Sequence, residues 1–185
     1  QELANTAWAF AALEICDPPV LAVSTARRQT DSRGAPVYLP QNLSNTAWAC
    51  AKLAYLAAPL LSSIAAAALA LLSEFAAQDL GNMPWAWATF ECKVAPLRNA
   101  LAAPSLRRIR DFNPQNVANT AWALAVRALQ DVPLLAALSS SSLPTLRDFG
   151  PQNLSNMAWS FSSLLVADAP LLDAIAAAAI SRSSE

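Results

Sequence analysis

Histidine is absent from the 185-residue sequence, and glycine occurs only three times. Without histidine, most metal sites, Ser-His-Asp triads and imidazole acid–base chemistry are excluded. We therefore expect no enzyme, no metal or cofactor and no small-molecule substrate. Three Gly against 13 Pro disfavour a turn-rich β-sandwich and favour helices delimited by proline. The odd number of cysteines, which fit no metal-binding spacing, is typical of a reducing compartment.

Charge of either sign is also scarce. Charged residues make up 14% of the chain and hydrophobic residues 55%, and 12 basic against 13 acidic residues give a net charge of −1. This composition excludes disorder and lacks the basic excess typical of nucleic-acid binders. Residues 53–73 carry no charge over a length sufficient to span a bilayer. Because Pro59 marks a turn within that run, we expect no transmembrane span.

An internal repeat organises the whole chain. Five tryptophans recur with steps of 40, 37, 37 and 37 residues: Trp8, Trp48, Trp85, Trp122 and Trp159. A Gln stands seven residues before each of them, an Asn three residues before it and a Pro eleven residues after it. The sequence therefore predicts one array of five units, spanning about 1–37, 38–74, 75–111, 112–148 and 149–185.

Within each unit the apolar spacing is helical. In the fourth unit the intervals are four, three and four residues for Val117, Ala121, Leu124 and Ala128. Pro114 stands where a helix begins, Asn113 is placed to cap it, and a second Pro opens a second helix. We therefore expect an all-α fold, an α-solenoid of about five antiparallel helix hairpins with a 37-residue period. Neither end carries a polar capping repeat, so we expect a fragment of a longer array.

The five repeated tryptophans are interpreted as core residues. Small residues surround each of them, which lets neighbouring helices approach closely while Trp and Leu fill the space between layers. The third unit differs from the others, because Pro84 stands beside its Trp and a further tryptophan, Trp87, follows.

The segment Phe112-Asn-Pro-Gln-Asn-Val-Ala-Asn-Thr-Ala-Trp-Ala-Leu-Ala resembles the octotricopeptide repeat and the related heptatricopeptide repeat. These arrays occur in organelle proteins of algae, dinoflagellates and apicomplexans, and the resemblance covers essentially the whole chain. It implies a protein of the mitochondrion or chloroplast that binds single-stranded RNA, organellar ribosomal RNA included. Transcript maturation, translation or ribosome assembly is the implied outcome.

One polar position varies between units, as a base-reading position in helical-repeat proteins should. It directly follows the shared Gln and is occupied, in the last four units, by Asn42, Asp79, Asn116 and Asn153. A small residue two positions later leaves room for a base. However, Asn or Asp in the first helical turn also caps free amides and suits the helix dipole. The sequence leaves base reading and capping open.

A second set of asparagines does not vary, so it cannot encode sequence: Asn5, Asn45, Asn82, Asn119 and Asn156. An Asn in mid-helix is unfavourable unless its amide is used. The set therefore forms either a hydrogen-bonded ladder between units or a grip on the backbone of an extended polymer, RNA or peptide.

Basic residues gather at the ends of second helices, chiefly Arg107, Arg108, Arg110 and Arg147. They either follow a phosphate backbone or form a solvated edge that suits the helix dipole, and acids beside them reduce their field. The low charge and high apolar content also suit a second function. In that alternative the chain is a scaffold subunit that packs against proteins of a large organellar complex and reads no RNA.

Overall fold

The computed structural model describes residues 29–30, 36–37, 39–54, 58–90, 97 and 100–183. These residues are helical apart from turns and one short antiparallel pair, β1 (Gln29–Thr30) with β2 (Pro36–Val37). The all-α class expected from the sequence is confirmed. Among the described helices, none has the length and apolarity needed to cross a membrane.

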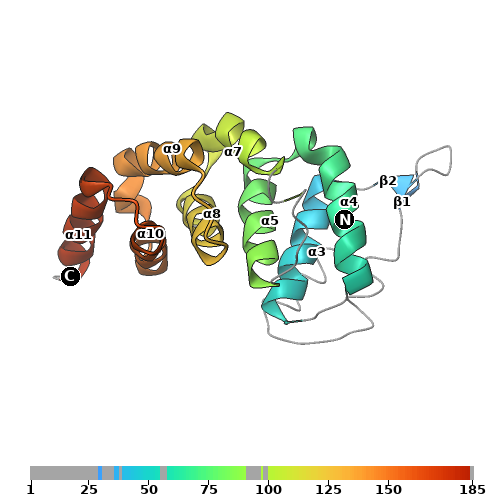
Figure 1. The fold of residues 1–185 in the computed structure, drawn as a ribbon, viewed down its shortest axis with the longest axis horizontal. Helices are drawn as coiled ribbons and strands as arrows, with labels where there is room; N and C mark the ends of the chain where they lie inside the picture. The colour runs from blue at the N-terminus through green and yellow to red at the C-terminus, as the bar shows by residue number, and fades with distance from the viewer. Residues whose placement is uncertain are drawn as a thin grey trace.

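Among the described residues, four helices of thirteen residues each carry the repeated Gln–Asn–Trp segment. They are α3 (Pro40–Lys52), α5 (Ala77–Thr89), α8 (Pro114–Val126) and α10 (Pro151–Ser163). Each begins 37 residues after the previous one. Helix α5 packs between α3 and α8, and α8 packs in turn against α10, so the four form one row (Figure 1). We call them the first helices.

The remaining helices form a second set, in which α7 and α9 lie along one side of this row in Figure 1 and α11 lies next to α10 at its end. Three of them end in 3-10 turns: α4 (Ala58–Leu71) with η1 (Leu72–Glu74), α7 (Ala102–Arg108) with η2 (Ile109–Asp111), and α9 (Val132–Ser142) with η3 (Leu143–Asp148). The last is α11 (Ala169–Ser183). The uncharged run at 53–73 is therefore divided, since α3 ends at Lys52 and α4 begins at Ala58.

Local sequence explains where these helices begin and end. Proline opens α3, α8 and α10, where its missing N–H costs no hydrogen bond. The predicted cap is confirmed, because Asn113 Oδ1 accepts a hydrogen bond from Asn116 N at 2.9 Å. After α3, α8 and α10 the chain turns through one residue with positive φ, at Ala54, Ala128 and Leu165. This left-handed residue ends each helix and starts the turn that follows.

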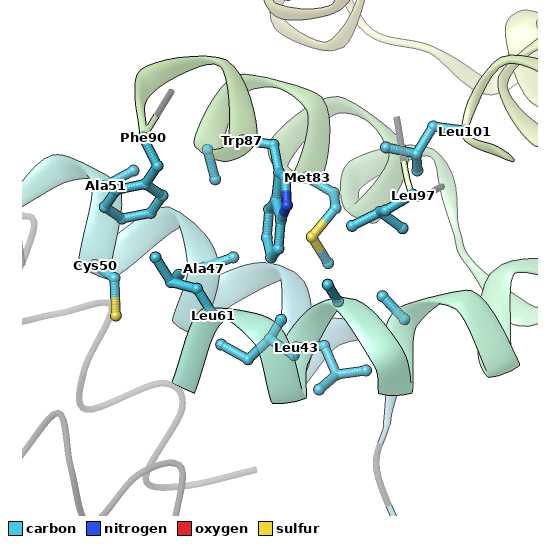
Figure 2. Packing of buried hydrophobic residues seen from close by; sticks show 14 of the residues in the cluster. Leu43, Ala47, Cys50, Ala51, Leu61, Met83, Trp87, Phe90, Leu97 and Leu101 are labelled. Atoms are coloured by element: carbon cyan, nitrogen blue, oxygen red, sulfur yellow. The ribbon is translucent and has the colours of Figure 1, made fainter. Parts of the chain in front are cut away.

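Two apolar clusters fill the space between the two sets of helices. Figure 2 shows the first, in which the Trp87 ring lies beside Met83 and above Leu61. The second holds Leu135, Leu138, Phe149, Met157, Phe161 and Leu171. Phe112 packs against both clusters and so links them. Where first helices touch one another, the buried residues are mainly small, such as Ala86 and Ala118, which permits their close approach.

Candidate nucleic-acid interface

The first helices share one solvent-facing stripe, built from the repeated Gln, Asn and Trp at positions i, i+4 and i+7, which lie on one side of a helix. The glutamines are exposed: Gln41, Gln78, Gln115 and Gln152. The asparagines beside them are buried in three units and half-buried in the last, and the tryptophans are half-buried or exposed. We call this stripe, repeated over four helices, the Gln–Asn–Trp face.

The tryptophans of this face form a regular row. The ring centroids of Trp48 and Trp85 are 6.1 Å apart with an interplanar angle of 34°. Trp85 and Trp122 repeat this geometry at 6.2 Å and 34°. Trp159 in the last unit is 48% exposed. Equal spacing and tilt show that α8 is placed on α5 in the same way as α5 is placed on α3.

The interpretation of the repeated tryptophans as core residues is wrong for Trp159, and Trp48, Trp85 and Trp122 are only half-buried. The physical reason is that second helices cover one side of each first helix and neighbouring first helices cover two more. The remaining side holds Trp together with the exposed Gln. Among the described tryptophans the one in the core is Trp87, which is 5% exposed and belongs to the third unit alone. Trp8 lies outside the described residues.

The variable position after the shared Gln lies between first helices. Asp79 is 3% exposed, and its Oδ1 accepts a 2.5 Å hydrogen bond from Ser44 Oγ of the preceding unit. Its Oδ2 accepts from Ala76 N at 3.0 Å, which caps α5. Burial raises the pKa of Asp79 above its ordinary value, and the hydrogen bonds from Ser44 and Ala76 oppose that rise. Asp79 therefore joins two units as well as capping its own helix.

Asn116 occupies the same place in the fourth unit. It is buried, and its Oδ1 accepts from Asn113 N at 3.2 Å, so both residues cap each other. A Cβ added at Gly81 would lie 2.6 Å from Asn116 Nδ2 and 2.9 Å from its Cα. The small residue of one unit, Gly81, thus leaves the space in which the polar residue of the next unit, Asn116, packs. The sequence contains both positions, but only the packing pairs them across units.

The capping interpretation is therefore confirmed at Asp79 and Asn116. Base reading stays a prediction, best suited to the half-buried Asn42 and Asn153. Asn42 Oδ1 and Asn45 Oδ1 are buried and have no hydrogen-bond partner in the described part of the chain. The ladder of constant asparagines also stays a prediction, and Asn5 lies outside the described residues.

The arginines form an exposed edge: Arg107, Arg108, Arg110 and Arg147. They lie at the ends of α7–η2 and in η3, a few residues before the N-termini of α8 and α10. Arg108 Nη1 lies 3.7 Å from Asp111 Oδ2, and Arg147 Nε lies 3.9 Å from Asp148 Oδ1. Exposed ion pairs of this kind contribute little to stability, but the acids reduce the positive field, as the sequence predicts.

No protein-family model matches the chain, and no curated protein matches it at a significant level. The described residues hold no group of three or more His, Cys, Asp or Glu side chains arranged to bind a metal ion.

Proposed function

We propose that this chain is a non-catalytic α-solenoid of 37-residue helix hairpins that binds single-stranded RNA along the Gln–Asn–Trp face. The observation that carries the proposal is the regular row of half-exposed tryptophans on consecutive first helices. By its resemblance to octotricopeptide and heptatricopeptide arrays, the protein acts in a mitochondrion or chloroplast. There it serves transcript maturation, translation or ribosome assembly.

Stacking is the interaction that this row supplies. Nucleobases stack on aromatic side chains with about 1–3 kcal/mol per base, and they do so for every base type. About two helical turns before each ring, on the same helix face, stands an exposed Gln, whose amide offers both donors and an acceptor to a base edge. One unit therefore presents one platform and one amide, which matches the one-base-per-repeat pattern of helical RNA-binding arrays.

Phosphate contacts are assigned to the arginine edge. The N-termini of α8 and α10 follow this edge closely in the chain and carry the positive end of the helix dipole. Arg107, Arg108, Arg110 and Arg147 supply formal positive charge there, although Asp111 and Asp148 cancel part of it. We therefore expect a shallow salt dependence compared with strongly basic RNA binders.

Binding of the purified chain to a randomised single-stranded RNA pool, measured over a salt series, tests the proposal. We expect selective enrichment, and Trp159→Ala should weaken binding about tenfold through the loss of one stacking platform. Leu165→Ala is the matched control, because Leu165 is 87% exposed but lies on a turn. Replacing Arg107, Arg108 and Arg110 with Gln should reduce the slope of log affinity against log salt by about 0.7 per lost phosphate contact.

The scaffold function is the second candidate, and one observation favours it. Val132, Leu165 and Ile180 are well exposed large apolar residues that lie on turns and second helices, away from the Gln–Asn–Trp face. Exposed apolar surface of this kind suits contact with another protein. If the chain is a scaffold that binds no RNA, the RNA pool shows no enrichment even at low salt. That result would contradict the RNA-binding proposal.

A further inference from the structure

A cavity of about 300 Å³ lies between the third and fourth units. Helices α5, α7, α8 and α9 line it, together with the turn between α8 and α9. Most of its wall is apolar, with Leu101, Leu124 and Leu134 among the lining residues. No residue of the Gln–Asn–Trp face contributes to the described lining. The cavity is therefore a separate feature from the proposed RNA interface.

The cavity lies where the third unit departs from the repeat. Trp87 lines it from α5, at the place that Leu124 occupies in α8, and Pro84 lines it where α8 has Ala121. Both substitutions change the wall that α5 turns toward α8. The two residues that set the third unit apart in sequence thus shape one cavity.

One hydrogen-bond donor at this cavity, the Arg127 guanidinium, is incompletely used. Arg127 Nη2 donates to the Trp87 carbonyl oxygen at 2.9 Å, which holds the guanidinium in place and leaves its other N–H groups for a further acceptor. The Trp87 indole Nε1 is not such a donor, because it is buried beside Met83 in the first cluster, out of reach of a ligand in the cavity.

The other polar groups of the wall are largely engaged. Ser105 and Thr120 donate their hydroxyl groups to carbonyl oxygens of their own helices. Gln130 Nε2 donates to the Leu164 carbonyl oxygen at 2.8 Å. Asp131 Oδ1 caps α9 by accepting from Leu134 N at 3.0 Å. These groups keep mainly acceptor oxygens, so Arg127 is the one positively charged residue in the described lining of an otherwise largely apolar cavity.

We propose that this cavity binds a small carboxylate with an apolar body of one or two rings. Small-molecule pockets begin at about 300 Å³, and an apolar cavity of about half that volume holds benzene. A carboxylate pairs with the guanidinium of Arg127 through charge-assisted hydrogen bonds, while its apolar body packs against Leu101, Leu124 and Leu134. The Asp131 carboxylate repels a second anionic group and so limits the ligand to one.

Three probes of one shape and different head groups test the charge preference: 1-naphthoate, 1-naphthylmethanol and 1-naphthylmethylamine. Calorimetric titration of the full chain should rank their affinities in that order. In amide and indole NMR spectra, 1-naphthoate should shift the indole signal that disappears in Trp87→Phe. Equal or tighter binding of the amine, or no binding by any probe, would overturn the proposal.

Two variants test the location. Arg127→Gln should weaken 1-naphthoate binding about tenfold, the scale of one charge-assisted hydrogen bond, and bring it to the level of the alcohol. Arg147→Gln is the matched control, because Arg147 is an exposed arginine outside the cavity. Ala102→Phe places a ring at the cavity wall from a half-buried position and should abolish binding while circular dichroism stays unchanged. Full affinity in either folded variant contradicts the assignment.

Discussion

The third and fourth units have first helices of the same length that begin 37 residues apart, yet they use the same positions differently. In the fourth unit a single tryptophan, Trp122, lies on the Gln–Asn–Trp face, and Leu124, two residues later, is half-buried and packs against the second cluster. In the third unit Trp85 keeps the place on that face, and Trp87 enters the core two residues later. One helix thus carries tryptophan in two roles, on the surface row and in the core.

The contacts between units differ in the same way. The third unit presents Gly81 to Asn116 of the fourth, whereas the second presents Ser44 to Asp79 of the third. A hydroxyl–carboxylate hydrogen bond joins one pair, and close backbone packing joins the other. The first helices are therefore placed with the same geometry at both junctions, but different side-chain contacts hold each junction together.

The largest expected effect separates the two roles of tryptophan. Trp87→Ala should lower the free energy of unfolding by about 3–5 kcal/mol, because it removes a buried ring from the first cluster. Leu124→Ala at the matching place in α8 should cost about 1–2 kcal/mol, since that side chain is only half-buried. Urea denaturation of both variants measures the difference. Equal losses would contradict the special role of the third unit.

A smaller effect tests the junction chemistry. Asp79→Ala should cost about 2 kcal/mol, since it removes the cap of α5 and the hydrogen bond between units, and leaves Ser44 Oγ only its 3.2 Å hydrogen bond to the Gln41 carbonyl oxygen. Asn116→Ala should cost about 1 kcal/mol, because it removes a cap but no hydrogen bond to another unit. Urea denaturation again provides the measurement, with Ser44→Ala plus Asp79→Ala as the double variant that isolates the pair.

Asp79 also gives this junction a pH dependence. Its pKa in the folded protein is raised above 3.8, mainly by burial, so the folded state holds the proton to a higher pH than the unfolded chain does. The stability that its neutral form contributes is complete below the unfolded pKa and is lost as pH rises through the raised folded pKa. Asp79→Asn stays neutral, so its unfolding free energy should lack this decline. Urea midpoints of both proteins across the acidic range decide the point.

Much of the fold follows from local sequence signals. Proline opens three of the four first helices and Asn113 caps α8, as expected from position alone. These signals act within one helical turn and need no knowledge of neighbours. The pairing of Ser44 with Asp79 lies beyond such reasoning, because it depends on which side of α3 meets which side of α5.

The exposure of the tryptophans was missed for a related reason. Apolar periodicity predicts that the largest apolar residue lies in the core. The other apolar positions nearby, such as Ala118 and Ala121, hold only small side chains. In the structure those alanines are fully buried because helices approach closely on them, and Trp122 is left on the open side. The signal for this was Gln115, an exposed polar residue seven positions before Trp122 and so on the same helix face.

The smallest effect tests the closest approach between units. Gly81→Ala adds a methyl group that meets the Asn116 backbone at 2.9 Å, so α5 and α8 must separate slightly. We expect a net loss of about 1 kcal/mol, because overpacking outweighs the gain in helix propensity that Ala brings. Ser155→Ala changes the same repeat position in α10, where the side chain is exposed, and should stay within about 0.5 kcal/mol of the parent. If Gly81→Ala were as stable as Ser155→Ala, the contact with Asn116 would not limit the spacing of the row, and the equal Trp–Trp distances would need another cause.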